Sequence, residues 1–222
     1  MKRGFAWLFP LAAIAVLLSF PWPPPLLTLL IAEVVIALLV WAGLWFGAPH
    51  GLGSVIPSPI RVVYAFLIGA ASGAVVLALL PLAGLQSRLI KEASIPVWKW
   101  LVIAFDSAVL EEIIFRLFIV SLVVWSGARV SRALQGAPEA RTTPTIIWIA
   151  LIVSALAFGA AHLSRWMDSG PIVIAAVMLV NGLIAIVLGR IYVKWGIEAA
   201  IVAHFAGDVV VHIIGPHFFT KG

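Results

Sequence analysis

Two adjacent glutamates and an arginine lie inside an apolar stretch long enough to cross a lipid bilayer. They are Glu111, Glu112 and Arg116, in the segment VLEEIIFRL at positions 109–117. An ionisable side chain at the centre of a bilayer costs about 2.5–3.5 kcal/mol even on insertion scales. Side chains of this kind must therefore be paired, hydrated or used in a reaction. We interpret them as one wall of an active site; the alternative is a buried polar cluster that only fixes the helix register.

Helical spacing gives the three side chains different roles. Glu112 and Arg116 are four residues apart and share a face of the helix, in the order that favours an intrahelical ion pair. Glu111 lies on a different face and has no such partner. A carboxylate removed from water binds a proton more readily. Glu111 is therefore the candidate for a general base that takes a proton from water.

Two further motifs place histidines in apolar runs. His162 follows the small residues of FGAA at 158–161, which would let a neighbouring helix or a substrate backbone come close. His204 and Asp208 are four residues apart, so their side chains can converge on one ion or one water molecule. Alternatively, His162 is an interfacial residue, and Asp208 only accepts a hydrogen bond from His204. His212 continues the same face and could support the pair.

The combined set of histidines and carboxylates is of the type that zinc binds, with one position left open for water. The candidate metal ligands are Glu111, His162, His204 and Asp208. The zinc motif H-E-x-x-H is absent, and so are the nucleophile elbow G-x-S-x-G, the P-loop and the dinucleotide fingerprint. A serine nucleophile stays open as an alternative, although small polar residues in membrane helices usually serve packing. The candidate serines are Ser107, Ser121 and Ser154.

The composition is that of a membrane protein. Of 222 residues, 64% are hydrophobic and 10% are charged, whereas soluble domains carry about 25% charged residues. The net charge of +5 comes mostly from basic residues at the ends of apolar runs, where they meet lipid headgroups, so we assign no nucleic-acid partner. The chain has no cysteine, which excludes thiol catalysis, thiolate metal sites and disulfides.

Proline, glycine and charged residues divide the chain into apolar runs long enough for membrane helices. We predict an all-α, polytopic transmembrane bundle of about seven helices, with six to eight as the range, forming a single membrane domain over residues 1–222. The first run resembles a signal peptide but lacks a small-residue cleavage site, so we expect a retained anchor. The predicted runs are 5–20, 26–47, 61–84, 97–125, 145–163, 171–193 and 196–214.

Three prolines mark predicted helix starts, because a first-turn proline lacks only an N–H that would be unpaired anyway. They are Pro96, Pro144 and Pro171. Thr143 and Ser169 precede two of them and are the expected N-caps.

The three motifs occur in the order E-E-x-x-x-R, F-x-x-x-H and H-x-x-x-D. This order resembles the CPBP family of intramembrane proteases, which includes the type II CAAX prenyl endopeptidases and bacterial proteins linked to bacteriocin immunity. The resemblance extends to the segment YVKWGIEAAIVAH at 192–204 and covers residues 97–215, the expected catalytic core. The first three runs resemble the family only as hydrophobic spans.

The resemblance implies a role for each motif residue. Glu111 would activate the attacking water with help from His162, and His204 and Asp208 would bind metal or stabilise the oxyanion. Glu112 and Arg116 would support them. Both a zinc mechanism and a metal-free glutamate mechanism are open for such enzymes. Where the prenyl endopeptidases usually have asparagine, this chain has Asp208; an ionised aspartate cannot donate to an oxyanion but is a good metal ligand, which favours metal unless the carboxyl is protonated.

We therefore expect an intramembrane endopeptidase, a metal-assisted enzyme with zinc, that uses a glutamate-activated water. Its substrate would be a protein or peptide anchored in the bilayer by a prenyl group or a transmembrane tail, and its location the cell membrane of a prokaryote. The competing hypotheses are a non-enzymatic immunity factor and a carrier that uses buried carboxylates and histidines as a proton relay. The oligomeric state is left open.

Overall fold

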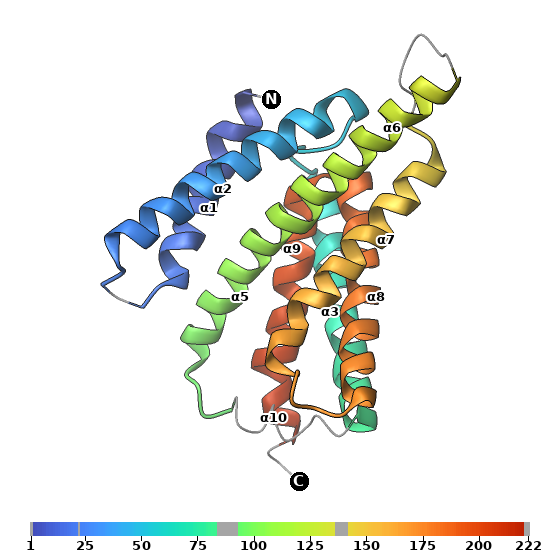
Figure 1. The fold of residues 1–222 in the computed structure, drawn as a ribbon. Coiled ribbons are helices and arrows are strands. Elements are labelled where there is room, and N and C mark those ends of the chain that lie inside the picture. Colours follow the sequence, from blue (N-terminus) through green and yellow to red (C-terminus); the bar gives the residue numbers. More distant parts are fainter. Residues whose placement is uncertain (1, 22, 84–92, 136–141, 220–222) are drawn as a thin grey trace.

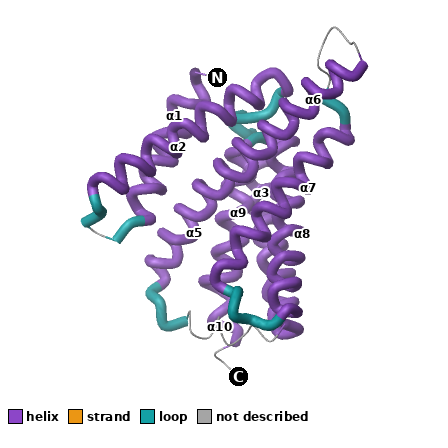
Figure 2. Tube along the Cα trace, viewed as in Figure 1, coloured by secondary structure: helices purple, strands orange, loops and turns teal. Residues whose placement is uncertain are grey.

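The structure is a computed structural model and describes residues 2–21, 23–83, 93–135 and 142–219. Within these ranges every regular element is a helix, and short turns connect most of them (Figures 1 and 2). The predicted all-α polytopic bundle is confirmed. Position 84, the last of the predicted run 61–84, lies outside the described residues.

Five helical segments of the described chain are long and apolar enough to cross a membrane. They are Leu26–His50, Pro59–Leu79, Pro144–Ser164, Pro171–Trp195 and Ile197–His217. The shorter apolar helix Gly4–Ser19 accompanies them. The remaining predicted run, 97–125, lies in the helix that carries the buried charges, so each of the seven predicted runs corresponds to helical structure.

The N-terminal helices form a hairpin at one side of the molecule (Figure 1). Helix α1 (Lys2–Ser19) packs against α2 (Leu26–Gly47) and against α5 (Val97–Glu111). Leu8, Ala12 and Ala15 are fully buried in the hydrophobic core. Large apolar side chains on the outer face of α2 are exposed, as lipid contact requires.

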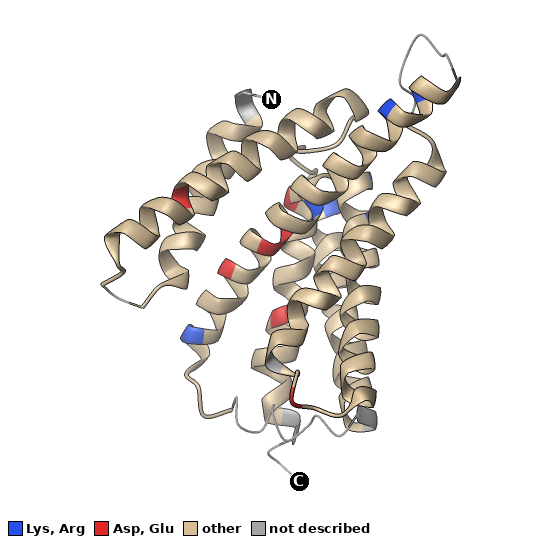
Figure 3. Cartoon of the chain, in the orientation of Figure 1, with Lys and Arg blue, Asp and Glu red and all other residues tan. Residues whose placement is uncertain are grey.

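The rod that carries the charged motif is one continuous helix built from three parts. Helix α5 runs into a π-helical segment, η3 (Glu112–Val120), and then into α6 (Ser121–Gln135). The helix thus extends beyond the predicted end at 125. In a π-helix the backbone hydrogen bonds close over five residues instead of four, and such segments frequently occur at functional sites. Figure 3 shows acidic positions following one another along α5 within the bundle.

Helix α3 and the helices that follow α6 complete the bundle. Its helices are α3 (Pro59–Leu79), α7 (Pro144–Ala161), α8 (Pro171–Trp195), α9 (Ile197–Asp208) and α10 (Gly215–Phe219), with a second π-helical segment, η5 (Val209–Ile214), between the last two. Short 3-10 turns follow α2, α3 and α7: η1 (Ala48–His50), η2 (Leu80–Ala83) and η4 (His162–Arg165).

Helices α3 and α9 pack with their backbones in close contact. A Cβ at Gly69 would overlap the carbonyl group of Ala203, and a Cβ at Gly73 would lie 2.6 Å from the Gly207 carbonyl oxygen. Small residues at helix contacts allow this approach in membranes. The contact fixes the position of α9, which carries His204.

The helix starts predicted at the three prolines are only partly confirmed. Thr143 Oγ1 accepts a hydrogen bond from the Ile146 N–H at 3.3 Å and caps α7, with Pro144 as its first residue. Pro171 begins α8, but its N-cap is Gly170, so the predicted cap at Ser169 is wrong. Ser169 instead donates its backbone N–H to the Trp166 carbonyl in the preceding turn. At α5, proline 96 is itself the N-cap and the helix begins at Val97.

Candidate active site

The side chains of Glu112 and Arg116 are completely buried, and Arg116 Nη1 lies 3.3 Å from Glu112 Oε1. Both residues belong to the π-helical segment η3, whose wider turn keeps residues four apart on one face. The predicted intrahelical pair is therefore present. Its surroundings are aromatic: the Arg116 guanidinium carbon lies 4.4 Å from the centre of the Phe158 ring, within the range of cation–π attraction.

His204 on α9 is bound to the same carboxylate. Its Nδ1 lies 2.8 Å from Glu112 Oε1. Because a carboxylate accepts, Nδ1 carries the proton, and in the neutral ring Nε2 presents a lone pair. That Nε2 lies 3.8 Å from Glu111 Oε2 and 3.7 Å from Asp208 Oδ1. Glu112 thus orients the imidazole that faces Glu111.

His162 reaches Glu111 from the end of α7. Its Nδ1 donates to the Phe158 carbonyl oxygen at 2.8 Å, which leaves Nε2 as the acceptor in the neutral ring. This Nε2 lies 3.9 Å from Glu111 Oε2. The close approach expected beside His162 is also present, since a Cβ at Gly159 would lie 3.0 Å from the Met178 carbonyl oxygen on α8.

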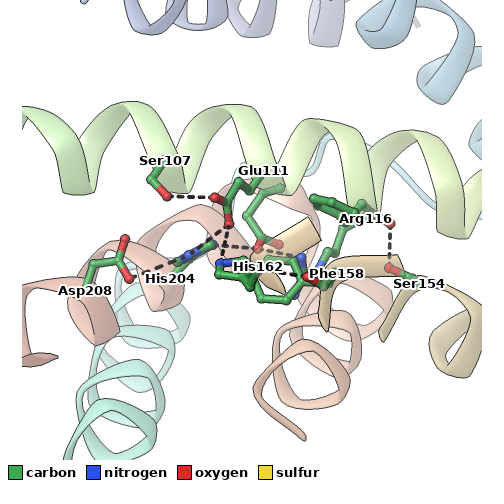
Figure 4. A network of polar contacts seen from close by, with 10 residues as sticks. Ser107, Glu111, Arg116, Ser154, Phe158, His162, His204 and Asp208 are labelled. Carbon is green, nitrogen blue, oxygen red and sulfur yellow. Dashed lines mark hydrogen bonds and ion pairs between the residues drawn. The ribbon is translucent and has the colours of Figure 1, made fainter. Parts of the chain in front are cut away.

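Glu111 is the point on which both histidines converge, as Figure 4 shows. Its Oε1 accepts a hydrogen bond from Ser107 Oγ at 3.1 Å. Its Oε2 is buried and has no hydrogen-bond partner among the described residues. A carboxylate oxygen of this kind, with two imidazole nitrogens nearby, is arranged to hold a water molecule or a cation.

The six predicted site residues therefore lie together, although they come from three separate stretches of sequence. Of the other singled-out polar residues, His212 interacts electrostatically with Asp208, whereas Ser121 and Ser154 contact other helices away from Glu111. His212 stacks on Trp100 with the ring centres 4.8 Å apart. The Ser121 and Tyr192 hydroxyls hydrogen-bond at 2.7 Å, and Ser154 Oγ donates to the Phe115 carbonyl at 2.8 Å, so both serines hold helices together.

A cavity of about 70 Å³ opens beside the site, which gives room for water. It is lined by His162, His204 and Asp208 together with Ser72 of α3 and Asn181 of α8. An apolar groove of about 170 Å³ between α3 and α8 adjoins it. The two spaces share Ser72, Val76 and Ile184 as lining residues.

The donor types fit zinc, but their spacing is too wide for a bound ion. Ligand atoms about 2.0–2.2 Å from a tetrahedral ion lie about 3.3–3.6 Å from one another. The separations from Glu111 Oε2 to the two Nε2 atoms are 3.8 and 3.9 Å, and no group of three metal-ligating side chains among the described residues is close enough to hold an ion. The buried Oε2 without a hydrogen bond and the two correctly oriented imidazoles still suit a cation after a small shift.

Sequence reasoning missed two contacts and one cavity residue. Ser107 binds the proposed base, although it was considered only as a nucleophile. Glu112 binds His204 across 92 residues of sequence, which helical spacing cannot reveal. Asn181 had a sequence signal: it is the only asparagine in the chain and lies within an apolar run.

Comparison with known proteins agrees with the motifs. The family model described as type II CAAX prenyl endopeptidase Rce1-like matches residues 93–210, more than half of the chain and a segment that includes all six predicted site residues. No curated protein and no solved structure matches the chain. The family is one of proteases, which implies a peptide or protein substrate. The apolar helices indicate an integral membrane protein. The chain belongs to the Rce1-like family of type II CAAX prenyl endopeptidases, as a CAAX-type intramembrane endopeptidase.

Proposed function

We propose that the enzyme cleaves a membrane-anchored protein or peptide with a water molecule activated by Glu111, within a catalytic core that spans residues 97–215. The observation that carries this proposal is the buried, unpaired Oε2 of Glu111, with the Nε2 atoms of His162 and His204 at 3.9 and 3.8 Å. A water molecule hydrogen-bonded at about 2.8 Å to both Glu111 Oε2 and His162 Nε2 fits a separation of 3.9 Å.

The steps follow from the hydrogen-bonding state of each side chain. Glu111 takes a proton from the water while His162 Nε2 accepts the other O–H and orients it. The water oxygen bonds to the carbonyl carbon, and the carbonyl electron pair moves to its oxygen. The oxyanion's electron pair then re-forms the C=O bond as the C–N bond breaks, and Glu111 returns its proton to the leaving nitrogen, which yields a carboxylic acid and an amine. The acid transfers its remaining proton to the amine, which leaves a carboxylate and an ammonium group. His204, held by Glu112 and so by Arg116, lies on the other side of Glu111.

Zinc assistance is a separate part of the proposal. The residues that would hold the ion are Glu111, His162, His204 and Asp208, and the ion would polarise the substrate carbonyl and acidify the water. The carboxylate at 208 supports this part, because it supplies the negative charge that favours a cation and lacks the donor that an oxyanion needs.

The apolar groove supports a lipid-modified substrate. Its lining is apolar except for Ser72, and it adjoins the cavity that His162 and His204 line, so a prenyl chain bound there would hold the adjoining peptide close to the site. We propose a prenylated substrate, a cleavage point near the membrane surface, and, from the resemblance to bacterial family members, the cell membrane of a prokaryote.

The test is cleavage of a farnesylated, fluorescence-quenched peptide ending in Cys-a-a-X by the purified full-length protein. Glu111→Gln keeps the size of the side chain and an acceptor for Ser107 but removes the base, so cleavage should stop while the thermal unfolding profile stays that of wild type. Full activity in the folded variant would reject the proposal. An immunity factor would keep its protective effect in the same variant, and a proton-coupled carrier would lose transport without any peptide product.

A further inference from the structure

The proposed reaction lacks a neutral donor for the developing oxyanion. Attack on a carbonyl places negative charge on its oxygen, and preorganised N–H or O–H donors at that position are the largest single contribution to many such reactions. One turn after His204 lies Asp208, whose carboxylate only accepts hydrogen bonds when it is ionised. In the metal-free form of the mechanism, another group that lines the cavity must therefore supply the donor.

Most donors on the cavity wall are already used. Ser72 Oγ donates its only proton to the Ile68 carbonyl at 2.8 Å. In their neutral forms, His162 donates from Nδ1 to Phe158, and His204 donates from Nδ1 to Glu112. Each of these three side chains lines the cavity, and none has a further proton to offer in its neutral state.

Asn181 on α8 is the exception. Its amide nitrogen carries two protons, and Nδ2 donates one of them to the Val177 carbonyl oxygen at 2.8 Å, one turn earlier in the helix. This bond fixes the amide plane and leaves the second N–H for the cavity, which Asn181 lines with His162, His204 and Asp208.

Asn181 also lies where a substrate would enter the cavity. Its neighbours on α8, Val180 and Ile184, line the apolar groove, and Ile184 lines both the groove and the cavity. A substrate whose lipid occupies the groove would present the adjoining peptide to this part of α8. A polar residue at this depth is expensive unless it is used, and the chain has no other asparagine.

We propose that Asn181 donates its second N–H to the carbonyl oxygen of the scissile bond and stabilises the oxyanion. It is then a catalytic residue on α8, outside the three motifs. This inference rests on the proposed water mechanism at Glu111, and the experiment separates the two.

Two replacements remove the donor with different effects on the helix. Asn181→Ser keeps one O–H, which can bond back to the carbonyl four residues earlier, as Ser72 does to Ile68. Asn181→Leu removes all polar groups. With the farnesylated Cys-a-a-X peptide, both variants should lose about 10²–10³-fold in kcat, the effect of removing one oxyanion donor. KM should change by less than about threefold, because the interaction forms only in the transition state.

Two further measurements distinguish a catalytic from a merely structural role. A peptidyl phosphonate inhibitor, whose tetrahedral oxygens mimic the oxyanion, should bind Asn181→Ser more weakly by a factor close to the loss in kcat/KM. Ser19→Ala, which removes a hydroxyl that donates to the Ala15 carbonyl within α1 and lines neither space, is the matched control and should keep wild-type kcat and inhibitor affinity. Asn181→Gln should recover part of the lost kcat.

Each outcome has one meaning. If Glu111→Gln is inactive and folded Asn181→Ser retains wild-type kcat, the Asn181 proposal is overturned and the water mechanism stands. Equal weakening of substrate and phosphonate binding with unchanged kcat would also overturn it. A wild-type protein that leaves the peptide intact, or an active Glu111→Gln variant, would overturn the proposed function and this inference together.

Discussion

Glu112 accepts a hydrogen bond from His204 at 2.8 Å with the same oxygen, Oε1, that lies 3.3 Å from Arg116. One buried carboxylate thus joins the continuous helix α5–η3–α6, helix α9 and a guanidinium that lies over the Phe158 ring. A carboxylate that orients a histidine fixes both its tautomer and its direction. Glu112 therefore acts through His204, as a positioning residue, whereas Glu111 faces the water.

Replacing Glu112 by Gln should destabilise the protein more than it changes the shape of the site. The amide oxygen can still accept from His204, but Arg116 loses its counter-charge while fully buried. Removing one partner of a buried ion pair costs about 3–5 kcal/mol. The double variant Glu112→Gln/Arg116→Met removes the unpaired charge and should unfold at a higher temperature than Glu112→Gln alone. Thermal unfolding in detergent measures this, and additive losses would show that the pair is not coupled.

Ser107 provides a test between a water nucleophile and a serine nucleophile. Its Oγ donates to Glu111 Oε1 at 3.1 Å, the geometry of a base-orienting contact. In the water mechanism, Ser107→Ala removes one neutral hydrogen bond, worth about 0.5–1.5 kcal/mol, and kcat should fall about two- to tenfold. A serine nucleophile would lose essentially all activity, and an acyl-enzyme would be detectable by mass spectrometry in the wild type.

Much of this site was predictable because its motifs are local. The pair of Glu112 with Arg116 follows from a spacing of four on one helix, and three sets of ionisable residues within apolar runs identify the helices that form the site. Contacts between helices were not predictable. Lipid-facing and core-facing positions are both apolar, so the sequence does not indicate that His204 faces Glu112, or that Asn181 lines the same cavity. The π-helical turn beginning at Glu112 also has no recognisable sequence signal, since neighbouring residues are ordinary helix formers.

Zinc analysis of the wild type and replacement of Asp208 test whether a metal ion assists cleavage. If a cation assists, the wild type contains zinc by elemental analysis, loses cleavage on chelation and regains it when zinc is added back. Asp208→Asn removes a charged ligand and should need at least about tenfold more zinc for the same activity, the range found when a metal site loses a supporting group. Full activity of the chelated wild type without bound metal would remove zinc from the proposal. The activation of water by Glu111 would be unaffected by that result.

The apolar groove should determine affinity for the lipid part of the substrate. Leu183 of α8 lines the groove and is 56% exposed, whereas Leu179 of the same helix is 63% exposed and does not line it. Leu183→Trp should fill the groove and raise KM for the farnesylated peptide about tenfold, which corresponds to about 1.4 kcal/mol of lost binding. Because the change lies away from Glu111, kcat at saturating peptide should stay close to wild type. Leu179→Trp adds the same ring to a lipid-facing position and should leave KM unchanged. Equal KM values in the two variants would mean that the prenyl chain binds elsewhere, since only one of the two rings occupies the space between α3 and α8.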